Sequence, residues 1–406
     1  MLPVMASRIL NWQEDRPAGP WRLKIFPTYR CNLECGICIR NWHDAPPILF
    51  DELPDERWLR LLDEAAAMGV RVLIIGGGGE PMLRSRLVRE MCVRAKEYGM
   101  EGSLQTNGTN LSGETIEALI NAGWDYVTIS VDAPVEDIND AIRNKGVFAR
   151  TENALRSLRE LKKRRRSALP NVAIHMTITS LNYKCLEGMV DFCLARDVNM
   201  LSASPLLEVG MEETEYVLNP EQRAAFPDLL KQAIEKADAH GLPHTLNSLL
   251  MLEDTHSANF VDSQGFCFPK GHLAGALCLE PWTALTINSS GHAGPCCFFW
   301  EEHADSIRDK TLQEVWTGPY LSQFRQQMRE GRPHPVCRNC YYPHTQEHRE
   351  LMDCVRQTAA VRPSIFPDWH ALPRKAWNSA RRYGLRGSWR RFQEWRTIRR
   401  TLKDDA

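Results

Sequence analysis

The chain has 406 residues, of which 43% are hydrophobic and 25% are charged, with a formal net charge of −1. This composition is typical of a globular protein of about two or three domains, and it excludes a disordered, collagen-like or coiled-coil chain. The near-zero net charge gives no reason to expect a nucleic acid as partner. No apolar run is long enough to cross a membrane, and the N-terminal segment lacks the apolar stretch of a signal peptide. We therefore expect a cytoplasmic protein.

Cysteine is the unusual residue, with 13 in a chain that carries no export signal. A disulfide framework does not suit a reducing compartment, and an odd number of cysteines cannot all pair. Metal ligation or catalysis is therefore the better interpretation. Two groups of cysteines stand out, one at residues 31–38 and the other at residues 278–340.

Short apolar strands alternate with amphipathic helices over residues 21–204. Helices are expected at residues 55–68, ended by Gly69, and at residues 113–122, where Ser112 can cap the start and Gly123 the end. Six repeats of this kind predict parallel strands covered by helices and curled into a partial (β/α)6 barrel, with functional groups at the carboxyl ends of the strands. The expected strands are residues 21–26, 70–75, 102–106, 126–131, 172–179 and 199–204.

The periodicity ends after one more helix, which we expect from Pro220 to Ala239. From about residue 246, Gly, Pro, aromatic and Cys residues become frequent and the helical pattern disappears. The predicted fold class is therefore α/β, with a small cysteine-rich domain after the barrel. The predicted divisions are an N-terminal extension (1–20), the barrel (21–245), the cysteine-rich domain (246–360) and a tail (361–406).

The first cysteine group, Cys31, Cys35 and Cys38, directly follows the first expected strand with the spacing C-x3-C-x2-C. Structural zinc usually takes four ligands, and no suitably spaced fourth Cys or His is nearby. Three thiolates on a short loop instead suit a [4Fe–4S] cluster that leaves one iron open, with a zinc or disulfide loop as the alternative. This arrangement resembles the radical S-adenosylmethionine (SAM) superfamily, whose signature is this spacing after the first strand of a partial (β/α)6 barrel.

The resemblance implies SAM-binding residues near this loop. Ile37 occupies the position that packs against adenine, where the family often has an aromatic residue. Gly78, Gly79, Glu80 and Pro81 match the family's G-G-E-P sequence, which binds the methionyl amino group of SAM. Without the resemblance, the same residues would be read as an ordinary βα turn.

Two further strand ends extend the match. Ser130 and Asp132 form an S-x-D pattern after the fourth strand, and Arg143 follows. In family members with extra clusters, such residues contact SAM. From the residues alone, a Ser/Asp pair can bond ribose hydroxyls and an arginine can pair with a carboxylate, while turn chemistry and a surface arginine are the alternative.

The second cysteine group can supply four thiolates from Cys278, Cys296, Cys337 and Cys340, with Cys297 as the alternative to Cys296. Such a set makes a complete site for an iron–sulfur cluster or for zinc. A glycine five residues before Cys296, a Trp- and Arg-containing helix and a P-x-C-x2-C sequence resemble the family's SPASM domain, or its smaller twitch form, which binds auxiliary [4Fe–4S] clusters. No further cysteine follows closely, which favours one auxiliary cluster. A zinc ribbon is the alternative.

Two features lie outside these motifs. Cys267 stands in the segment that joins the barrel to the cysteine-rich domain, and we consider it a candidate catalytic residue that donates a hydrogen atom, with an extra metal ligand or inert packing as alternatives. The tail has 12 Lys and Arg against 4 Asp and Glu, a net charge of +8. An aromatic and apolar stripe in the tail predicts a basic amphipathic helix that can lie on an anionic membrane surface or pack on protein: Trp389, Phe392, Trp395, Ile398 and Leu402.

The resemblance implies an enzyme with two [4Fe–4S] clusters and SAM as cofactors. In the family, the reduced first cluster cleaves SAM to methionine and a 5′-deoxyadenosyl radical, which takes a hydrogen atom from a substrate carbon. An auxiliary cluster can then accept an electron, so we expect oxidation, dehydrogenation or epimerisation. A flavodoxin or ferredoxin-type protein is the expected electron donor.

The substrate class is less constrained. The first expected strand begins about 20 residues into the chain, which leaves no separate leader-peptide-binding or cobalamin-binding domain before the barrel. We therefore expect a small molecule, a sugar or a lipid-linked glycan, with contact at the inner face of the membrane through the tail. A peptide- or protein-modifying enzyme is the alternative within the family, and a zinc-held interaction protein is the alternative that is not an enzyme.

Overall fold

The computed structural model describes residues 2–12, 16–42, 46–206, 214–250, 278–296, 301, 303–334, 337, 340 and 346–361. Cys267, Cys297 and the tail from residue 362 lie outside these residues. The strands form one sheet in the order β6-β5-β4-β3-β2-β1-β7-β8. Their bounds are β1 (Arg22–Ile25), β2 (Val72–Ile75), β3 (Glu101–Thr106), β4 (Tyr126–Ser130), β5 (Asn171–Ile178), β6 (Met200–Pro205), β7 (Ala284–Ile287) and β8 (Ala293–Gly294).

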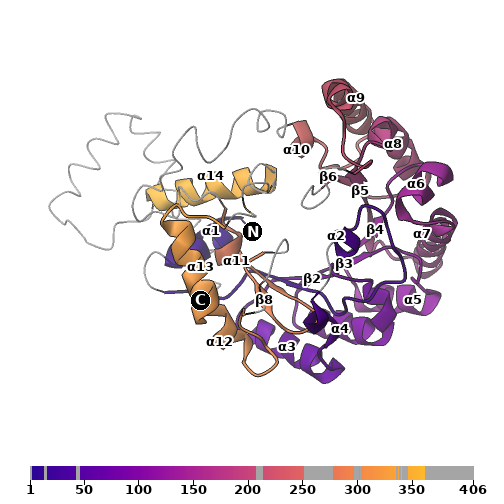
Figure 1. Cartoon of the computed structure of the whole chain (residues 1–406). Coiled ribbons are helices and arrows are strands. Elements are labelled where there is room, and N and C mark those ends of the chain that lie inside the picture. The colour runs from indigo at the N-terminus through magenta and orange to yellow at the C-terminus, as the bar shows by residue number, and fades with distance from the viewer. Residues whose placement is uncertain are drawn as a thin grey trace, which may run out of the picture.

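The predicted partial barrel is confirmed. Strands β1 to β6 pair in sequence order and all in parallel, each within two residues of its predicted bounds. Figure 1 shows helices α3 to α9 on the outer side of the curved sheet. The helices that accompany the strands are α2 (Ile39–Trp42), α3 (Asp55–Ala67), α4 (Ser85–Glu97), α5 (Gly113–Ala122), α6 (Glu136–Arg143), α7 (Val147–Arg165), α8 (Leu186–Ala195), α9 (Pro220–Ala239) and α10 (Asn247–Leu250).

Helix ends follow the capping residues that the sequence indicated. The Ser112 hydroxyl accepts a hydrogen bond from the Thr115 N–H at the start of α5, and Gly123 ends that helix in the left-handed region with a φ of 66°. At α9, the Asn219 side chain and Gln222 form a reciprocal capping box. These local bonds fix the lengths of the helices that cover the sheet.

Strand alternation separates two environments. The outward side chains of β1, Leu23 and Ile25, are fully buried in the core beneath the helices, and the same holds for every second residue of the other barrel strands. The residues between them, such as Lys24 on β1 and His175 on β5, are only partly buried and face the inside of the barrel. The core therefore lies between the sheet and the helices, and the inner face of the sheet is mostly polar, with Val72 and Ile74 of β2 as apolar exceptions.

The cysteine-rich region continues the barrel sheet. Strand β7 pairs in parallel with β1, placing Leu285 opposite Leu23, and β8 pairs antiparallel with β7. The sequence did not predict these two short strands, which are only four and two residues long. Part of the region assigned to residues 246–360 is therefore joined to the barrel by backbone hydrogen bonds.

The remaining helices are α1 (Leu2–Asn11), α11 (Glu280–Thr283), α12 (Leu312–Trp316), α13 (Pro319–Arg329) and α14 (Gln346–Val361). Short 3-10 turns occur at η2 (Pro47–Phe50), η3 (Pro81–Arg84) and η4 (Tyr183–Cys185).

A second apolar core holds the two ends of the described chain together. Helix α1, from the segment predicted as an N-terminal extension, packs against α14, and both lie beside α13 (Figure 1). Their buried contacts include Ile9, Trp282, Phe324 and Val355. None of the helices that the structure describes combines the length and the apolar character needed to span a bilayer.

A buried arginine supports this second core. The Arg325 guanidinium lies 4.4 Å from the Trp12 ring centroid and 4.1 Å from that of Trp316. It donates hydrogen bonds to the carbonyls of Pro281 and Trp316. Burial lowers the pKa of Arg325 to about 9. Trp316 and Arg325 of the sequence motif thus have a structural role, because their contacts fix α12 and α13 against the N-terminal segment.

Candidate active site

The first cysteine loop lies at the carboxyl end of β1. Cys31, Cys35 and Cys38 are half-buried and free of disulfides. The Cys38 N–H donates to the Cys35 carbonyl at 3.1 Å, and the Asn41 N–H donates to the Cys38 carbonyl at 2.8 Å. This tight backbone winding gathers the three thiols on one short loop, as the spacing predicted.

The three thiols influence one another electrostatically. Burial raises the pKa of Cys35 to about 11, with Cys38 and Cys31 raising it further and Arg143 opposing the change. Burial also raises the pKa of Cys31, against which Arg40 acts. A bound metal deprotonates its thiol ligands outright. Desolvated thiols flanked by two arginines therefore suit metal-bound thiolates better than a free nucleophile.

The end of helix α6 holds the loop from a distant part of the chain. The Gly36 N–H donates to the Ile142 carbonyl at 2.9 Å, and the Glu34 N–H donates to Asn144 Oδ1 at 2.8 Å. Asn144 Nδ2 in turn donates to the Glu34 carbonyl at 3.4 Å. Asn144 has a φ of 96°, a conformation that L residues rarely adopt without a compensating contact. Its paired bonds to Glu34 supply that contact and set the loop conformation.

The glycine run after β2 lets two backbones approach. Gly76, Gly77 and Gly78 all have positive φ, and a Cβ on Gly79 would overlap the Arg30 carbonyl. The Gly79 N–H donates to the Thr28 carbonyl at 3.0 Å. The backbone at Gly78 and Gly79 therefore lies directly against the start of the cysteine loop, as a shared ligand site requires.

Glu80 is buried and already has three protein donors. Its carboxylate accepts hydrogen bonds from the Met82 N–H at 2.9 Å, the Thr106 hydroxyl at 2.6 Å and the Asn107 N–H at 2.8 Å. Burial raises the pKa of Glu80, and the bonds from Thr106, Asn107 and Met82 oppose that rise. Besides the ligand role expected of it, Glu80 thus ties the end of β2 to the end of β3. Pro81 follows as the first residue of η3.

Asn107 is a site residue that the sequence reasoning did not assign. Its Nδ2 donates to Asn32 Oδ1 at 3.0 Å and lies 4.0 Å from Cys31 Sγ, while its Oδ1 accepts from the Thr109 N–H at 2.9 Å. The signal available in the sequence was its position directly after β3. It orients an amide donor toward the first cysteine, and hydrogen bonds to cluster sulfurs are among the influences on cluster potential.

The S-x-D strand end and Arg143 come together. Asp132 is fully buried, its Oδ2 lies 2.6 Å from Arg143 Nε, and its Oδ1 accepts from the Thr177 N–H at 2.8 Å. Ser130 lies opposite His175 in the sheet register. The sequence analysis noted that Arg143 can pair with a carboxylate, and the carboxylate that the structure places beside it is that of Asp132. The carbonyl of Arg143 also accepts a contact from Cys35 Sγ at 3.7 Å.

Tyr216 is a second residue that the sequence gave no reason to select. Its side chain lies so close to Gly36 that a Cβ there would overlap the phenol. The neighbouring segment is anchored by a hydrogen bond from the Ser180 N–H to the Tyr216 carbonyl at 2.9 Å. An aromatic ring from the segment before α9 thus covers the cysteine loop beside Ile37, which is itself half-buried.

The second cysteine group also assembles, beside the second apolar core. Burial raises the pKa of Cys278 well above its usual range, with Cys340 and Cys296 adding to the rise, so these three thiols lie near one another. The Cys340 N–H donates to the Cys337 carbonyl at 3.3 Å, which places Cys337 one turn away. Cys278 and Cys337 both pack against the second apolar core. Cys297 and Cys267 lie outside the described residues, so the alternatives that involve them stay predictions.

The donor sets fit iron–sulfur clusters better than single ions. Among the residues that the structure describes, no three His, Cys, Asp or Glu side chains stand close enough to enclose one metal ion. A four-iron cluster is wider than a single ion and takes thiolates that stand further apart. Each group provides thiols that form no disulfide and are partly shielded from solvent, and thiolates are the ligands such clusters use.

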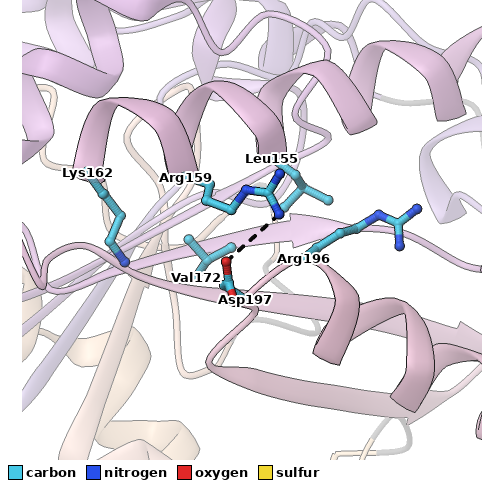
Figure 2. A pocket seen from close by; sticks show the side chains of 6 residues that line it. All are labelled: Leu155, Arg159, Lys162, Val172, Arg196 and Asp197. Atoms are coloured by element: carbon cyan, nitrogen blue, oxygen red, sulfur yellow. Dashed lines mark ion pairs between the residues drawn. The ribbon is translucent and has the colours of Figure 1, made fainter. Parts of the chain in front are cut away.

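A small surface pocket lies away from this chemistry. Figure 2 shows it at the amino ends of the barrel strands, between α7, the start of β5 and the end of α8. Its cations already have partners, since Arg159 pairs with Asp197 at 3.9 Å and Arg196 pairs with Glu152 at 2.5 Å. It therefore takes no part in the candidate site.

Comparisons with known proteins agree with the geometry. The family model of the radical SAM superfamily matches residues 25–193, and that of the SPASM iron–sulfur cluster-binding domain matches residues 278–341. A pre-heme d1 synthase of Dinoroseobacter shibae is 28% identical over 80% of this chain and 78% of its own length. A PqqA peptide cyclase of Granulibacter bethesdensis is 26% identical over 77% of each chain. The structure of SuiB from Streptococcus suis bound to S-adenosylmethionine superposes with a TM-score of 0.58 at 18% identity, covering 79% of this chain and 71% of SuiB.

Proposed function

The chain belongs to the radical SAM superfamily and carries a C-terminal SPASM domain, and from this premise we propose that it cleaves SAM reductively and removes a hydrogen atom from a carbon of a small-molecule substrate. Its cofactors are SAM and [4Fe–4S] clusters, one that binds SAM and one auxiliary. The observation that carries the proposal is the meeting of the Cys31–Cys35–Cys38 loop with the glycine run and Glu80 at one edge of the barrel.

In this proposal Cys31, Cys35 and Cys38 hold the first cluster, and Cys278, Cys296, Cys337 and Cys340 hold the auxiliary one. When bound, the first cluster and SAM supply an electron and a 5′-deoxyadenosyl radical that takes a hydrogen atom, and the auxiliary cluster takes up an electron, which gives a net oxidation. A flavodoxin or ferredoxin-type protein delivers the electron.

The chain's own residues bind and orient. The backbone of Gly78 and Gly79 lies where a ligand can approach without meeting a side chain, and Glu80 offers carboxylate charge to an ammonium group. Ile37 packs against the adenine. Ser130 and Asp132 face the ribose, and Arg143 holds the Asp132 carboxylate in place through their 2.6 Å contact.

Two relatives bear on the class of substrate. The name of the pre-heme d1 synthase relative makes a carboxylate-bearing tetrapyrrole the first small molecule to test, ahead of the sugar or lipid-linked glycan that the sequence favoured. The PqqA peptide cyclase relative supports the alternative, a peptide-modifying enzyme. The polar inner face of the barrel suits a polar substrate of either kind.

The test is a reaction of the anaerobically purified protein with SAM and a strong reductant. We expect methionine and 5′-deoxyadenosine in equal amounts, measured by liquid chromatography with mass spectrometry, and about eight irons per chain for two clusters. A colourless, zinc-containing protein that leaves SAM intact would support the zinc-held interaction protein instead.

A further inference from the structure

The inner face of the barrel is polar where closed barrels are filled with branched apolar side chains. Every second residue of these strands points inward, because its neighbours lie in the core beneath the helices. Most of these inward side chains are only partly buried, so a ligand inside the barrel can reach them. Beyond the first residue of each strand, the inward polar residues are Lys24, Ser103, Gln105, Thr128, Ser130, His175, Thr177, Ser202 and Ser204.

Lys24 is the sole cation in that set. Its Nζ lies 5.7 Å from the centroid of the Phe26 ring, two residues further along β1, and that ring lies against Gly77. Two carboxylates of the expected SAM site are already engaged, Asp132 with Arg143 and Glu80 with its three donors. Within the described part of the chain, no carboxylate forms an ion pair with Lys24. The ammonium therefore faces the lumen and lies over the Phe26 ring.

His175 marks the opposite wall. Its Nδ1 lies 3.1 Å from the Ser202 hydroxyl, and its Nε2 lies 3.2 Å from the Ser204 hydroxyl. Burial lowers the pKa of His175 to about 4, and the positive charge of Lys24 is among the further causes. Three strands separate β5 from β1 in the sheet, so this influence acts across the lumen and not along the sheet. The imidazole is thus neutral at physiological pH, and it adds no second positive charge.

We propose that Lys24 binds a carboxylate of the substrate inside the barrel, with the rest of the substrate lying against the Ser202–His175–Ser204 wall. This inference rests on the proposed function, and it identifies the side chain that recognises the substrate at the same site. One ammonium matches the single charge of a carboxylate, whereas a phosphate is usually met by several cations or backbone N–H groups.

The carboxylate of SAM is the other source of the same chemistry. The residues expected to hold SAM lie at or beyond the carboxyl ends of the strands, at residues 31–38, 78–81 and 130–143. Lys24 lies within β1, before Phe26, and its charge acts on a residue in the middle of β5. This depth in the barrel assigns Lys24 to the substrate, and the experiment below separates the two sources.

The experiment uses full-length, cluster-loaded protein with SAM and follows binding of Fe-coproporphyrin III, a haem that bears propionate groups, by its Soret absorption. The same haem with every propionate methylated is the matched neutral probe. Lys24→Met removes the charge and keeps the length of the side chain, and Lys24→Arg keeps the charge. Lys163→Met is the matched control, because Lys163 is exposed at the end of α7, at the opposite end of the barrel.

We expect the acid to bind wild type more tightly than the ester does. Lys24→Met should weaken binding of the acid about ten- to a hundredfold, as expected for loss of a hydrogen bond to a charged group, while leaving the ester unchanged. Lys24→Arg should restore most of the affinity, and Lys163→Met should have no effect. Iron content and SAM affinity, measured by calorimetry, should stay at wild-type values in all three variants.

Three results would overturn the inference. Equal binding of the acid to wild type and Lys24→Met removes Lys24 from substrate recognition. A loss of SAM affinity in Lys24→Met, with haem binding unchanged, assigns Lys24 to the SAM carboxylate. Failure of wild type to bind either haem refutes the inference together with the tetrapyrrole substrate. Production of 5′-deoxyadenosine, measured separately, then shows whether the proposed SAM chemistry still holds.

Discussion

The Nε atom of Arg143 lies 2.6 Å from Oδ2 of Asp132, and both side chains are buried beside the first cysteine loop. Asp132 raises the pKa of Arg143 against the effect of burial, which lowers it. The pair joins the end of β4 to the end of α6, and α6 in turn holds the cysteine loop through Ile142 and Asn144. The geometry of the candidate cluster site therefore depends on this ion pair.

Replacing Asp132 with Asn should destabilise the protein strongly. The substitution leaves the buried guanidinium of Arg143 without its counter-charge, and breaking a buried pair in this way costs about 3–5 kcal/mol. The measurement is urea unfolding of the anaerobically prepared protein. Asp353→Asn is the control, because Asp353 pairs with Arg356 at 3.0 Å on the exposed face of α14, where a pair contributes less than about 1 kcal/mol. Equal effects of the two substitutions would contradict this role for the pair.

The two cysteine groups should hold separate clusters. Changing Cys31, Cys35 and Cys38 together to Ala should leave about half the iron and abolish formation of 5′-deoxyadenosine. Changing Cys278, Cys337 and Cys340 should remove the other half and leave the first cluster in place. Iron analysis and electron paramagnetic resonance of the reduced proteins check both results. Full iron in either triple variant would show that the cysteines in question are not cluster ligands.

Glu80→Gln should weaken SAM binding without removing the first cluster. The loss of a charge-assisted hydrogen bond to the SAM ammonium corresponds to roughly 1.5–3 kcal/mol, or about ten- to a hundredfold in affinity by calorimetry. Because the Glu80 carboxylate also accepts three protein hydrogen bonds, we expect a lower unfolding midpoint as well. Glu97→Gln, on the exposed end of α4, is the control. A lower midpoint with unchanged SAM affinity would limit Glu80 to joining β2 and β3.

His175 should make the protein less stable in mild acid. Its pKa is lowered from 6.5 to about 4 in the folded protein, so between these values the unfolded chain binds a proton that the folded protein does not. Stability is therefore lost as pH falls through this window, by about 2 kcal/mol between pH 7 and pH 5. His175→Gln should remove that part of the pH dependence. The check is urea unfolding of both proteins at the two pH values, and parallel pH profiles would contradict the prediction.

The tail prediction concerns residues outside those that the structure describes. Full-length protein should sediment with anionic vesicles, because basic residues near an anionic surface contribute about 1 kcal/mol each and the aromatic stripe can be buried. A chain that ends near residue 360, and so keeps nearly all of the packed helix α14, should stay in solution. Binding should weaken between about 0.1 M and 1 M salt as the Debye length shrinks from about 10 Å to about 3 Å. If both chains stay in the supernatant at low salt, the tail packs on protein.

The sequence by itself determined the local elements and their order. The six barrel strands, the limits of α5 and α9 and the placement of both cysteine groups all follow from short-range patterns. Apolar spacing, capping residues and metal-ligand spacing act over a few residues, so they can be read directly along the chain. The G-G-E-P sequence was found for the same reason.

Only the tertiary structure decided which distant residues meet. β7 lies beside β1 although about 260 residues separate them, Arg143 faces Asp132 and not solvent, and Tyr216 covers Gly36. Glu80 also proved to be surrounded by protein donors. These contacts arise when the sheet curves and its strand ends converge, and the pairing of strand edges depends on the packing of the whole chain. No short sequence pattern specifies how the sheet curves. The sequence therefore located the cofactor motifs, and the fold determined the lumen between them.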